Sequence, residues 1–167
     1  MPLVVPPAPG RRQRVDPGAL AGGDSALGRY LNLWREARAT DSVHFLARLQ
    51  ARGLERRILV VDHDARTGDF VFRYLGADLA FVDDRARTAL IGMSPWTFGD
   101  APTVRIAAEG WHAAIGADRP LAELVDTPRL DAAGQPLRAP FRRLVLPMPV
   151  NARTTRIIVA SELLPAG

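Results

Sequence analysis

The sequence predicts an α+β domain in which an antiparallel sheet is covered on one face by helices. Residues 24–53 carry apolar side chains at helical spacings of three and four. A pair of β-branched or alternating runs follows at 58–75, and three more strand-like runs occur after residue 120. Between these two groups, residues 76–116 indicate short helices and one longer helix. Strands gathered in two groups around a helical block are typical of the α+β class.

The composition is that of an ordinary globular chain and excludes several kinds of site. Hydrophobic residues make up 47% and charged residues 24% of the chain, and cysteine is absent, which excludes disulfides and thiolate zinc sites. No apolar run approaches the ~20 residues that cross a bilayer, and the N-terminus lacks the order of a secretory signal. We therefore expect a soluble cytoplasmic protein without a membrane span.

The basic residues are all arginine, 22 in number, and their excess lies in the first third of the chain. Residues 1–57 hold ten arginines and five acidic residues, whereas residues 58–167 hold twelve and thirteen. A basic segment can attract phosphate groups or acidic partners. Aromatic residues do not alternate with these arginines, however, and a helix-turn-helix pattern is absent from the sequence. Nucleic-acid binding is therefore not expected.

The N-terminal part divides into an extension and two helices. Residues 1–23 hold five prolines and four glycines, which predicts a flexible extension ahead of a single domain at 24–167. Asp24 or Ser25 can cap the first helix, and the second ends near Gly53, a suitable C-cap. The apolar stripe of the first helix would pack on the domain's own sheet or on a second subunit, as a homodimer contact. This stripe consists of Leu27, Tyr30, Leu31 and Trp34.

Five strands are predicted, a hairpin before the helical block and three strands after it. The hairpin consists of runs at 58–64 and 69–75 joined by a glycine-bearing turn. The last part of the helical block, 101–116, has helical spacing, with Pro102 in its first turn and Gly116 as a C-cap. The three later strands lie at 121–128, 141–148 and 155–164.

The second strand carries aromatic residues at alternate positions, Phe70, Phe72 and Tyr74. Alternation places these three side chains on one face of the strand and Arg73 on the other. A half-buried core strand explains this pattern without a ligand. Gly76 follows as a turn residue for which we expect a positive φ.

Few residues suggest catalysis or metal binding. In the run Asp62-His63-Asp64, strand alternation places the two carboxylates on one face and the imidazole on the other, so the three cannot converge on one metal. None of the four serines lies in a nucleophile-elbow motif. We therefore assign no catalytic residue and no metal ligand.

Four short strings carry a likeness to a known family. They are YLNLW at 30–34, ILVVDHD at 58–64, FRYLGADLA at 72–80 and FRRLVLPMPV at 141–150. These strings resemble the PAS superfamily of sensor domains, and most closely its stand-alone bacterial members. The resemblance implies a five-stranded antiparallel sheet with helices on one face and a small cavity between them, preceded here by the amphipathic helix. It also implies that the domain binds a small molecule or a partner protein and relays a signal without catalysis.

The resemblance also indicates where a ligand would bind. The pocket candidates lie on the second strand and the helical block and are Phe72, Tyr74, Trp96, Trp111, His112 and Ile115. Some haem-binding PAS sensors take their iron ligand from the long helix, so haem bound through His112 is one cofactor hypothesis. The apolar stripe of that helix centres on Trp111 instead, which favours a rim position for His112.

We therefore expect a non-catalytic sensory or regulatory domain that binds a small molecule or a protein and signals through a dimer or a partner protein. Two alternatives use the same residues. The first is a small α+β enzyme with a cone-shaped fold, in which His112 would pair with Asp62 or Asp64. The second is a structural adaptor with a filled core and no ligand.

Overall fold

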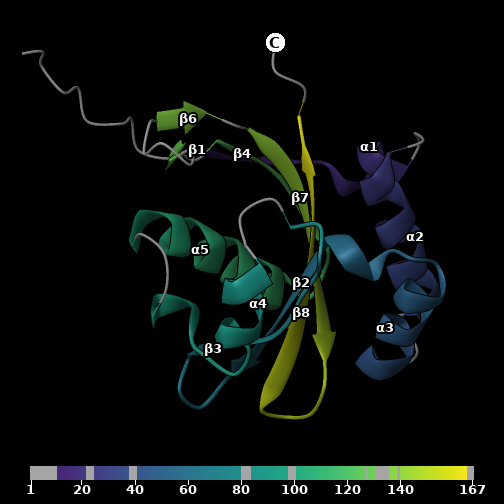
Figure 1. The fold of residues 1–167 in the computed structure, drawn as a ribbon. Coiled ribbons are helices and arrows are strands. Elements are labelled where there is room, and N and C mark those ends of the chain that lie inside the picture. Colours follow the sequence, from purple (N-terminus) through teal and green to yellow (C-terminus); the bar gives the residue numbers. More distant parts are fainter. Residues whose placement is uncertain are drawn as a thin grey trace, which may run out of the picture.

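The computed structural model describes residues 11–21, 25–37, 41–79, 84–97, 101–126, 128–130, 136–138 and 140–164 (Figure 1). Asp24, named above as a possible cap, lies outside these ranges. The helices are α1 (Pro17–Ala21), α2 (Ala26–Ala37), α3 (Ser42–Ala51), α4 (Asp84–Leu90) and α5 (Ala101–Ala117), with 3₁₀ turns η1 (Glu55–Arg57) and η2 (Pro95–Thr97). The strands are β1 (Arg11–Val15), β2 (Ile58–Asp64), β3 (Phe70–Leu75), β4 (Leu121–Asp126), β5 (Pro128–Leu130), β6 (Pro136–Arg138), β7 (Phe141–Pro149) and β8 (Thr154–Leu163).

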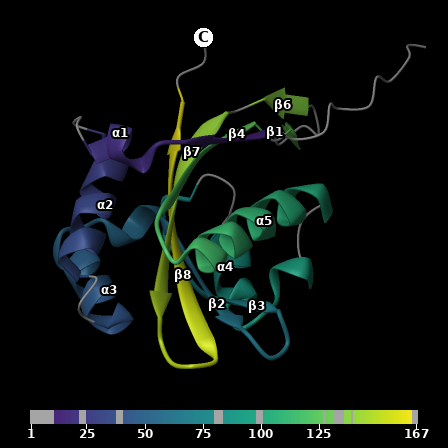
Figure 2. The ribbon, with the colours of Figure 1, turned by 180° about the vertical axis from the view of Figure 1, so that it is seen from behind.

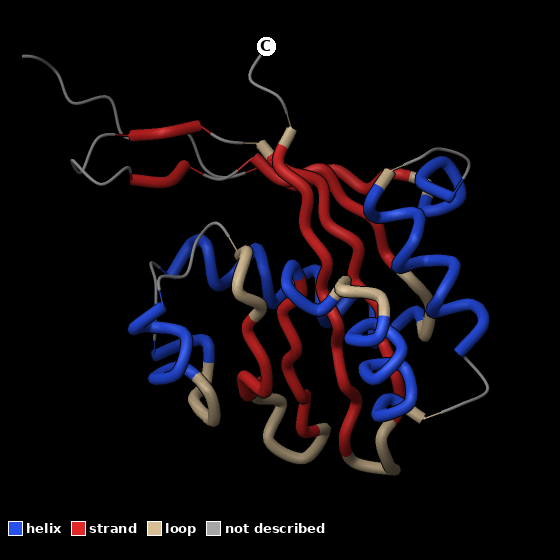
Figure 3. Tube along the Cα trace, turned by 45° about the vertical axis from the view of Figure 1, so that its right-hand side comes forward, coloured by secondary structure: helices blue, strands red, loops and turns tan. Residues whose placement is uncertain are grey.

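Six strands form the main sheet, in the order β1-β4-β7-β8-β2-β3, and every pairing in it is antiparallel. Five of these strands, β2, β3, β4, β7 and β8, are the strands predicted from the sequence. The α+β class with an antiparallel sheet is therefore confirmed, with one strand more than predicted. The short strands β5 and β6 pair only with each other and project beyond the main sheet (Figure 3).

The additional strand, β1, corrects one prediction. Residues 11–21, which the sequence placed in a flexible extension, form β1 and the short helix α1. β1 pairs with β4 from Arg11↔Asp126 to Val15↔Ala122, and Val15 packs against the core. The pairing satisfies backbone N–H and C=O groups that would otherwise be free along β4. These backbone hydrogen bonds depend on β4, which is distant in the sequence. The proline and glycine content of residues 11–21 therefore does not predict the strand.

Helices cover both faces of the sheet (Figure 1, Figure 2). α4 and α5 form the predicted cover of one face, and the leading helices α2 and α3 lie on the other. The structure therefore shows the first of the two predicted uses of the α2 stripe, packing on the domain's own sheet. Its four side chains are buried within this chain, and the homodimer stays a prediction. They are Leu27, Tyr30, Leu31 and Trp34.

The core on the α2–α3 face is apolar and its polar atoms have partners. Tyr30 Oη donates a hydrogen bond to Leu54 O at 2.7 Å. Trp34 Nε1 donates to Pro147 O at 3.2 Å. Large amphipathic rings are stable in a core when their polar atom is paired in this way. The sheet contributes Ile58, Val60, Ala122, Leu144, Leu146, Met148, Ile158 and Ala160 to this core.

Helix ends confirm two predicted caps and correct a third. Ser25 Oγ accepts the Gly28 amide at 3.1 Å and so caps α2. Gly53, after α3, takes a positive φ of 65°. Gly116 was the predicted cap of the long helix, but the left-handed residue is Asp118, with a φ of 48°. The short side chain of aspartate tolerates this conformation better than most residues do.

A β-bulge in the β2–β3 pair breaks the predicted aromatic alternation. The register shifts between Val60 and Val61, so that Val61 lies opposite Phe72 and Val60 lies opposite Tyr74. Phe72 therefore packs against the core under α5, whereas Tyr74 shares a face with Val60 of the opposite core. The prediction of one common face is wrong for Tyr74, because the extra residue, Arg73, reverses the parity of the strand.

Gly76 is needed for a different reason from the one predicted. Its φ is not positive, contrary to the prediction. A Cβ atom at this position would, however, overlap the backbone carbonyl groups of Glu55 and Arg56. The Gly76 amide donates to Ile58 O at 2.9 Å, and the Asp78 amide donates to Arg56 O at 2.7 Å. The glycine thus allows the turn after β3 to lie directly against η1.

Candidate functional site

Four ring side chains meet where α5 lies on the sheet; three of them are buried, and His112 is exposed at the rim. We call them the aromatic cluster, and they are His63 of β2, Phe70 of β3, and Trp111 and His112 of α5. Phe70 lies at the centre, with its ring centroid 4.9 Å from His63, 4.8 Å from His112 and 5.0 Å from Trp111. His63 and His112 also meet edge-on at 5.3 Å. β2 and β3 bring His63 and Phe70 together because these residues are register partners.

The aromatic cluster contains two buried polar atoms without a partner. His63 is 9% exposed and Trp111 is 2% exposed. Within the described part of the chain, neither His63 Nε2 nor Trp111 Nε1 has a hydrogen-bond partner. Buried polar groups in folded proteins are nearly always paired with protein, water or a ligand. These two atoms therefore mark a place in the interior with unused hydrogen-bonding capacity.

The protonation state of His63 follows from its surroundings. Burial lowers the pKa of His63 below its ordinary value and the neighbouring His112 lowers it further, while Asp64 and Asp69 act in the opposite direction. Because an ordinary histidine already has a pKa of about 6.5, the His63 ring is neutral at pH 7. A neutral imidazole has one donor and one acceptor nitrogen, so this side chain can meet either kind of ligand atom.

The loop after α4 is fixed to the edge of β3, next to the aromatic cluster. The Phe72 amide donates to Met93 O at 3.0 Å, and the Gly92 amide donates back to Phe72 O at 2.8 Å. Ser94 Oγ donates to Asp69 Oδ1 at 2.9 Å in the turn before β3. These bonds cover the backbone of the edge strand and hold one wall of the cluster in place.

A buried ion pair sets the depth of α5 on the sheet. Arg143 Nε donates to Glu123 Oε2 at 2.7 Å, and Arg143 Nη2 donates to Ile106 O of α5 at 2.9 Å. Both ionic side chains are buried. A Cβ atom at Gly110 would overlap Arg143 and Glu123, so the glycine lets the helix approach this closely. The helix that carries Trp111 and His112 is therefore anchored one residue before them.

The structure separates the six predicted pocket residues. Four lie on the α5 side of the sheet: Phe72, Trp111, His112 and Ile115. Trp96 is 53% exposed in η2, and Tyr74 is 37% exposed on the opposite side, so neither joins the aromatic cluster. Sequence reasoning missed His63 and Phe70 as members. Strand alternation did set His63 apart from its neighbours, but which helix covers that face depends on tertiary structure.

Asp62 lies on the face opposite the aromatic cluster, where two arginines hold it. Arg156 Nε donates to Asp62 Oδ1 at 2.7 Å, and Arg73 Nε donates to Asp62 Oδ2 at 2.9 Å. Burial would raise the pKa of Asp62, but the hydrogen bonds and charges of Arg156 and Arg73 together lower it below its ordinary value. The Asp62–His112 pair of the enzyme alternative is therefore not formed.

Two further hypotheses do not match the geometry either: the pairing of Asp64 with His112 and the ligation of haem by His112. Asp64 Oδ1 accepts the Arg66 amide at 2.8 Å in the turn after β2. A haem between α5 and the sheet would need open space in front of His112, but the rings of His63 and Phe70 lie there, at 5.3 and 4.8 Å. The arrangement does not fit haem ligation through His112. Among the described residues, no group of three histidine or acidic side chains could hold a metal ion.

Comparisons with known proteins give a likeness at the level of structure. No family model matches this chain, and no curated protein matches it. The solved structure of an RNA-binding light-oxygen-voltage receptor superposes with a TM-score of 0.46 and 16% sequence identity. The match covers 94% of this chain and 40% of the receptor's chain, so this chain spans about two fifths of that protein's length. None of the helices in the described ranges has the length and apolarity needed to cross a membrane.

Proposed function

We propose that this protein is a non-catalytic sensory domain whose ligand binds between α5 and the sheet, at the aromatic cluster. The observation that carries the proposal is the pair of buried polar atoms without partners, His63 Nε2 and Trp111 Nε1. One atom comes from a strand and the other from a helix, so a ligand that pairs with both would fix these elements relative to each other. The resemblance of the sequence to PAS-like sensors supports the same location.

The chemistry of the aromatic cluster selects a small, flat and largely apolar ligand. Aromatic walls favour stacked or edge-to-face contacts with another ring. An indole nitrogen can only donate a hydrogen bond, so the ligand needs an acceptor atom for Trp111. The neutral ring of His63 supplies a second hydrogen bond, as donor or as acceptor.

Ligand binding would change the position of α5 relative to the sheet. The ring centroids of the cluster lie 4.8 to 5.3 Å apart, so a ligand that enters between them must move α5 away from β2 and β3. The anchor at Gly110 limits this displacement to the part of the helix beyond the ion pair. The outward face of α5, with exposed Arg105, is available to a partner protein or to a second copy of this chain. Relay by such a contact completes the proposed function.

Native mass spectrometry of protein purified without denaturation tests the proposal. Wild-type protein should retain a small molecule, and Trp111→Phe and His63→Phe should each reduce the retained fraction about tenfold, because each removes one buried hydrogen bond. Two exposed residues provide matched controls: Trp96→Phe and His44→Phe should retain the ligand as wild type does.

Two results would contradict the proposed function. In the first, the wild-type protein retains no molecule, and a library of small aromatic compounds leaves the NMR signals of β2, β3 and α5 unshifted. In the second, a ligand is retained equally by the cluster variants and by their controls. The first result favours the adaptor alternative, in which the core is filled, and the second would place the ligand outside the aromatic cluster.

A further inference from the structure

β1 covers one border of the main sheet with few side-chain contacts. It is the outer strand beside β4, and the chain continues from it into the five-residue helix α1, which packs on α2. Gln13, Arg14 and Asp16 are exposed, whereas Val15 packs against the apolar core. Backbone pairing with β4 therefore contributes much of what holds this strand in place.

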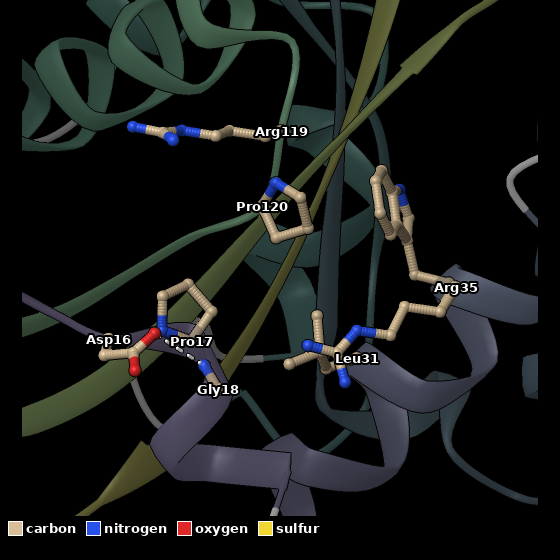
Figure 4. Close-up of a pocket in the computed structure, with 8 residues that line it drawn as sticks. Asp16, Pro17, Gly18, Leu31, Arg35, Arg119 and Pro120 are labelled. Atoms are coloured by element: carbon tan, nitrogen blue, oxygen red, sulfur yellow. Dashed lines mark hydrogen bonds between the residues drawn. The ribbon is translucent and has the colours of Figure 1, made fainter.

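The turn after β1 is loosely packed on the rest of the fold. A pocket of about 440 Å³ lies between this turn and α2. Figure 4 shows the turn residues Asp16–Gly18 on one side of the pocket and Leu31 and Arg35 of α2 on another. Folded interiors leave few spaces larger than a water molecule. The turn therefore adds little to the attachment of β1.

Arg12 connects β1 to a group of charges under α5. Arg12 Nη1 lies 3.3 Å from Glu123 Oε1, and Arg12 Nη2 lies 3.7 Å from Glu109 Oε2. The other oxygen of Glu123 accepts a hydrogen bond from Arg143 Nε at 2.7 Å. Without Arg12, this group would hold two carboxylates and one guanidinium. The border of β4 therefore requires one more cation, which β1 supplies.

The contact between Arg12 and Glu123 is incomplete. Glu123 has no exposed surface, yet within the described ranges neither Arg12 Nη1 nor Glu123 Oε1 has a hydrogen-bond partner. A buried acceptor without a hydrogen bond destabilises a structure, and hydrogen bonds between charged groups are among the strongest. An arginine that reached Glu123 at a hydrogen-bonding angle would therefore bind more tightly than Arg12 does.

We propose that the border of β4 binds an extended, arginine-bearing segment of a partner protein, and that β1 occupies this site until the partner displaces it. The site, which we call the β4 edge site, consists of Glu109, Glu123 and the β4 backbone groups that pair with β1. The partner segment would pair with β4 as an added strand, a common mode of peptide recognition. Its arginine would replace Arg12. An apolar residue three positions later would replace Val15, because such residues lie on opposite faces of a strand.

A partner protein fits the β4 edge site better than a second copy of this chain does. A second copy would bring the same β1 and the same incomplete contact with Glu123. It would also compete with a tethered strand, whose effective concentration is on the order of millimolar. A partner can improve on β1 through a better-oriented arginine and through pairing longer than five residues. The β4 edge site shares no residue with the aromatic cluster, so this proposal and the proposed function can fail separately.

Peptide binding to the full chain tests the proposal. The probe is a fluorescent peptide with the sequence of residues 11–17, RRQRVDP. Arg12→Glu combined with Val15→Asp weakens the attachment of β1 and leaves β4 unchanged. Fluorescence anisotropy should show that the peptide binds this double variant about tenfold more tightly than it binds wild type, because the tethered strand no longer competes. Arg14→Gln is the matched control and should bind as wild type does, since Arg14 is exposed and has no ion pair in the described part of the chain.

Changes in the peptide and in the site assign the recognition to one arginine. Glutamine in place of the peptide arginine that corresponds to Arg12 should weaken binding about tenfold, because a charge-assisted contact is lost. The same change at the position of Arg14 should have no effect. Glu123→Gln in the double variant should weaken binding of the original peptide to a similar extent. NMR shifts should occur at the amides of β4, Leu121–Asp126.

Thermal unfolding shows whether the double variant folds. If it does not, Arg12→Gln alone is the milder variant, and the same peptide should bind it more tightly than it binds wild type. Hydrogen exchange of the β4 amides measures release of β1 directly. Exchange should be faster in Arg12→Gln than in Arg14→Gln, because only the first weakens the contact with Glu123.

Four results would overturn the proposal. Equal binding to wild type and to the variants that weaken β1 would show that β1 does not occupy a binding site. Equal binding of the two altered peptides would remove the arginine from the proposal. Binding without shifts in β4 would place the peptide elsewhere. A wild-type dimer in native mass spectrometry that Arg12→Glu with Val15→Asp abolishes would replace the partner protein by a second copy of the chain.

Discussion

The two faces of the sheet are both buried, but they are buried in different ways. On the α2–α3 face, Tyr30 and Trp34 pack among aliphatic side chains and have partners for their polar atoms. On the α5 face, the corresponding atoms of His63 and Trp111 have none. Ion pairs occur on both faces, Arg143–Glu123 beneath α5 and Arg156–Asp62 next to α3. The first face has the features of a core that only stabilises the fold. The second retains hydrogen-bonding capacity that stability alone does not require.

The largest expected effect tests the stabilising role of the α2–α3 face. Phe45 of α3 has no exposed surface, and Phe45→Ala should lower the free energy of unfolding by about 4 kcal/mol, because it removes apolar contacts and leaves a cavity. Urea denaturation measures this loss. Folded Phe45→Ala protein should still retain the small-molecule ligand, whereas Phe70→Ala should not. Loss of the ligand from Phe45→Ala at temperatures where it is folded would contradict the division between the two faces.

A smaller effect is expected where α5 meets the ion pair. Gly110→Ala should lower the free energy of unfolding by about 2 kcal/mol, because the added methyl group overlaps Arg143 and Glu123. The matched control lies on the same helix. A Cβ atom at Gly116 meets nothing within 4 Å, so Gly116→Ala should be neutral or stabilising by about 0.5 kcal/mol. Equal effects of the two substitutions would show that the ion pair does not set the depth of the helix.

The smallest effect concerns His63, and its sign depends on pH. Because folding lowers the pKa of His63, the unfolded chain binds more protons as the pH falls through about 6.5. The free energy of unfolding of the wild type should therefore decrease as the pH falls from about 6.5 toward the lower pKa that His63 has in the folded chain. His63→Phe should lose this part of the dependence and gain about 1 kcal/mol at neutral pH, because a buried polar atom without a partner is removed.

Urea unfolding at about pH 5 and about pH 7.5 measures both parts of this prediction. His44→Phe, which changes an exposed histidine of α3, should keep the wild-type difference between the two pH values. If His63→Phe also kept that difference, the pH dependence would have to arise from another group.

Local patterns predicted most of the fold. The spacing of Leu27, Tyr30, Leu31 and Trp34 predicted α2, and the β-branched run at 58–64 predicted β2. β1 was missed because its five residues carry no apolar alternation and owe their conformation to pairing with β4. Local sequence predicts elements that bury their own apolar stripe, but not an edge strand that depends on a distant partner.

The candidate site was less predictable than the fold. Alternation alone placed Phe70, Phe72 and Tyr74 on one face, whereas the bulge at Arg73 moves Tyr74 to the other. A register shift depends on both strands of a pair, so the sequence of one strand cannot reveal it. The contact of His63 with His112 joins residues 49 positions apart, and it exists only because Gly110 allows α5 to lie close to the sheet.

The strand β1 gives the arginine-rich N-terminal segment a physical consequence for solubility. Its sequence, RRQRV, forms one outer strand of the sheet. An unprotected outer strand offers free backbone groups to the sheets of other molecules and so invites aggregation. Arg12 is ion-paired with Glu123 and Glu109, whereas the exposed Arg14 would repel the arginines of a second copy of this strand and disfavour such pairing. At the opposite border, the bonds of β3 to Gly92 and Met93 occupy the same kind of backbone groups. Charge protects one border of the sheet and a covering loop protects the other, so neither outer strand pairs readily with a second molecule.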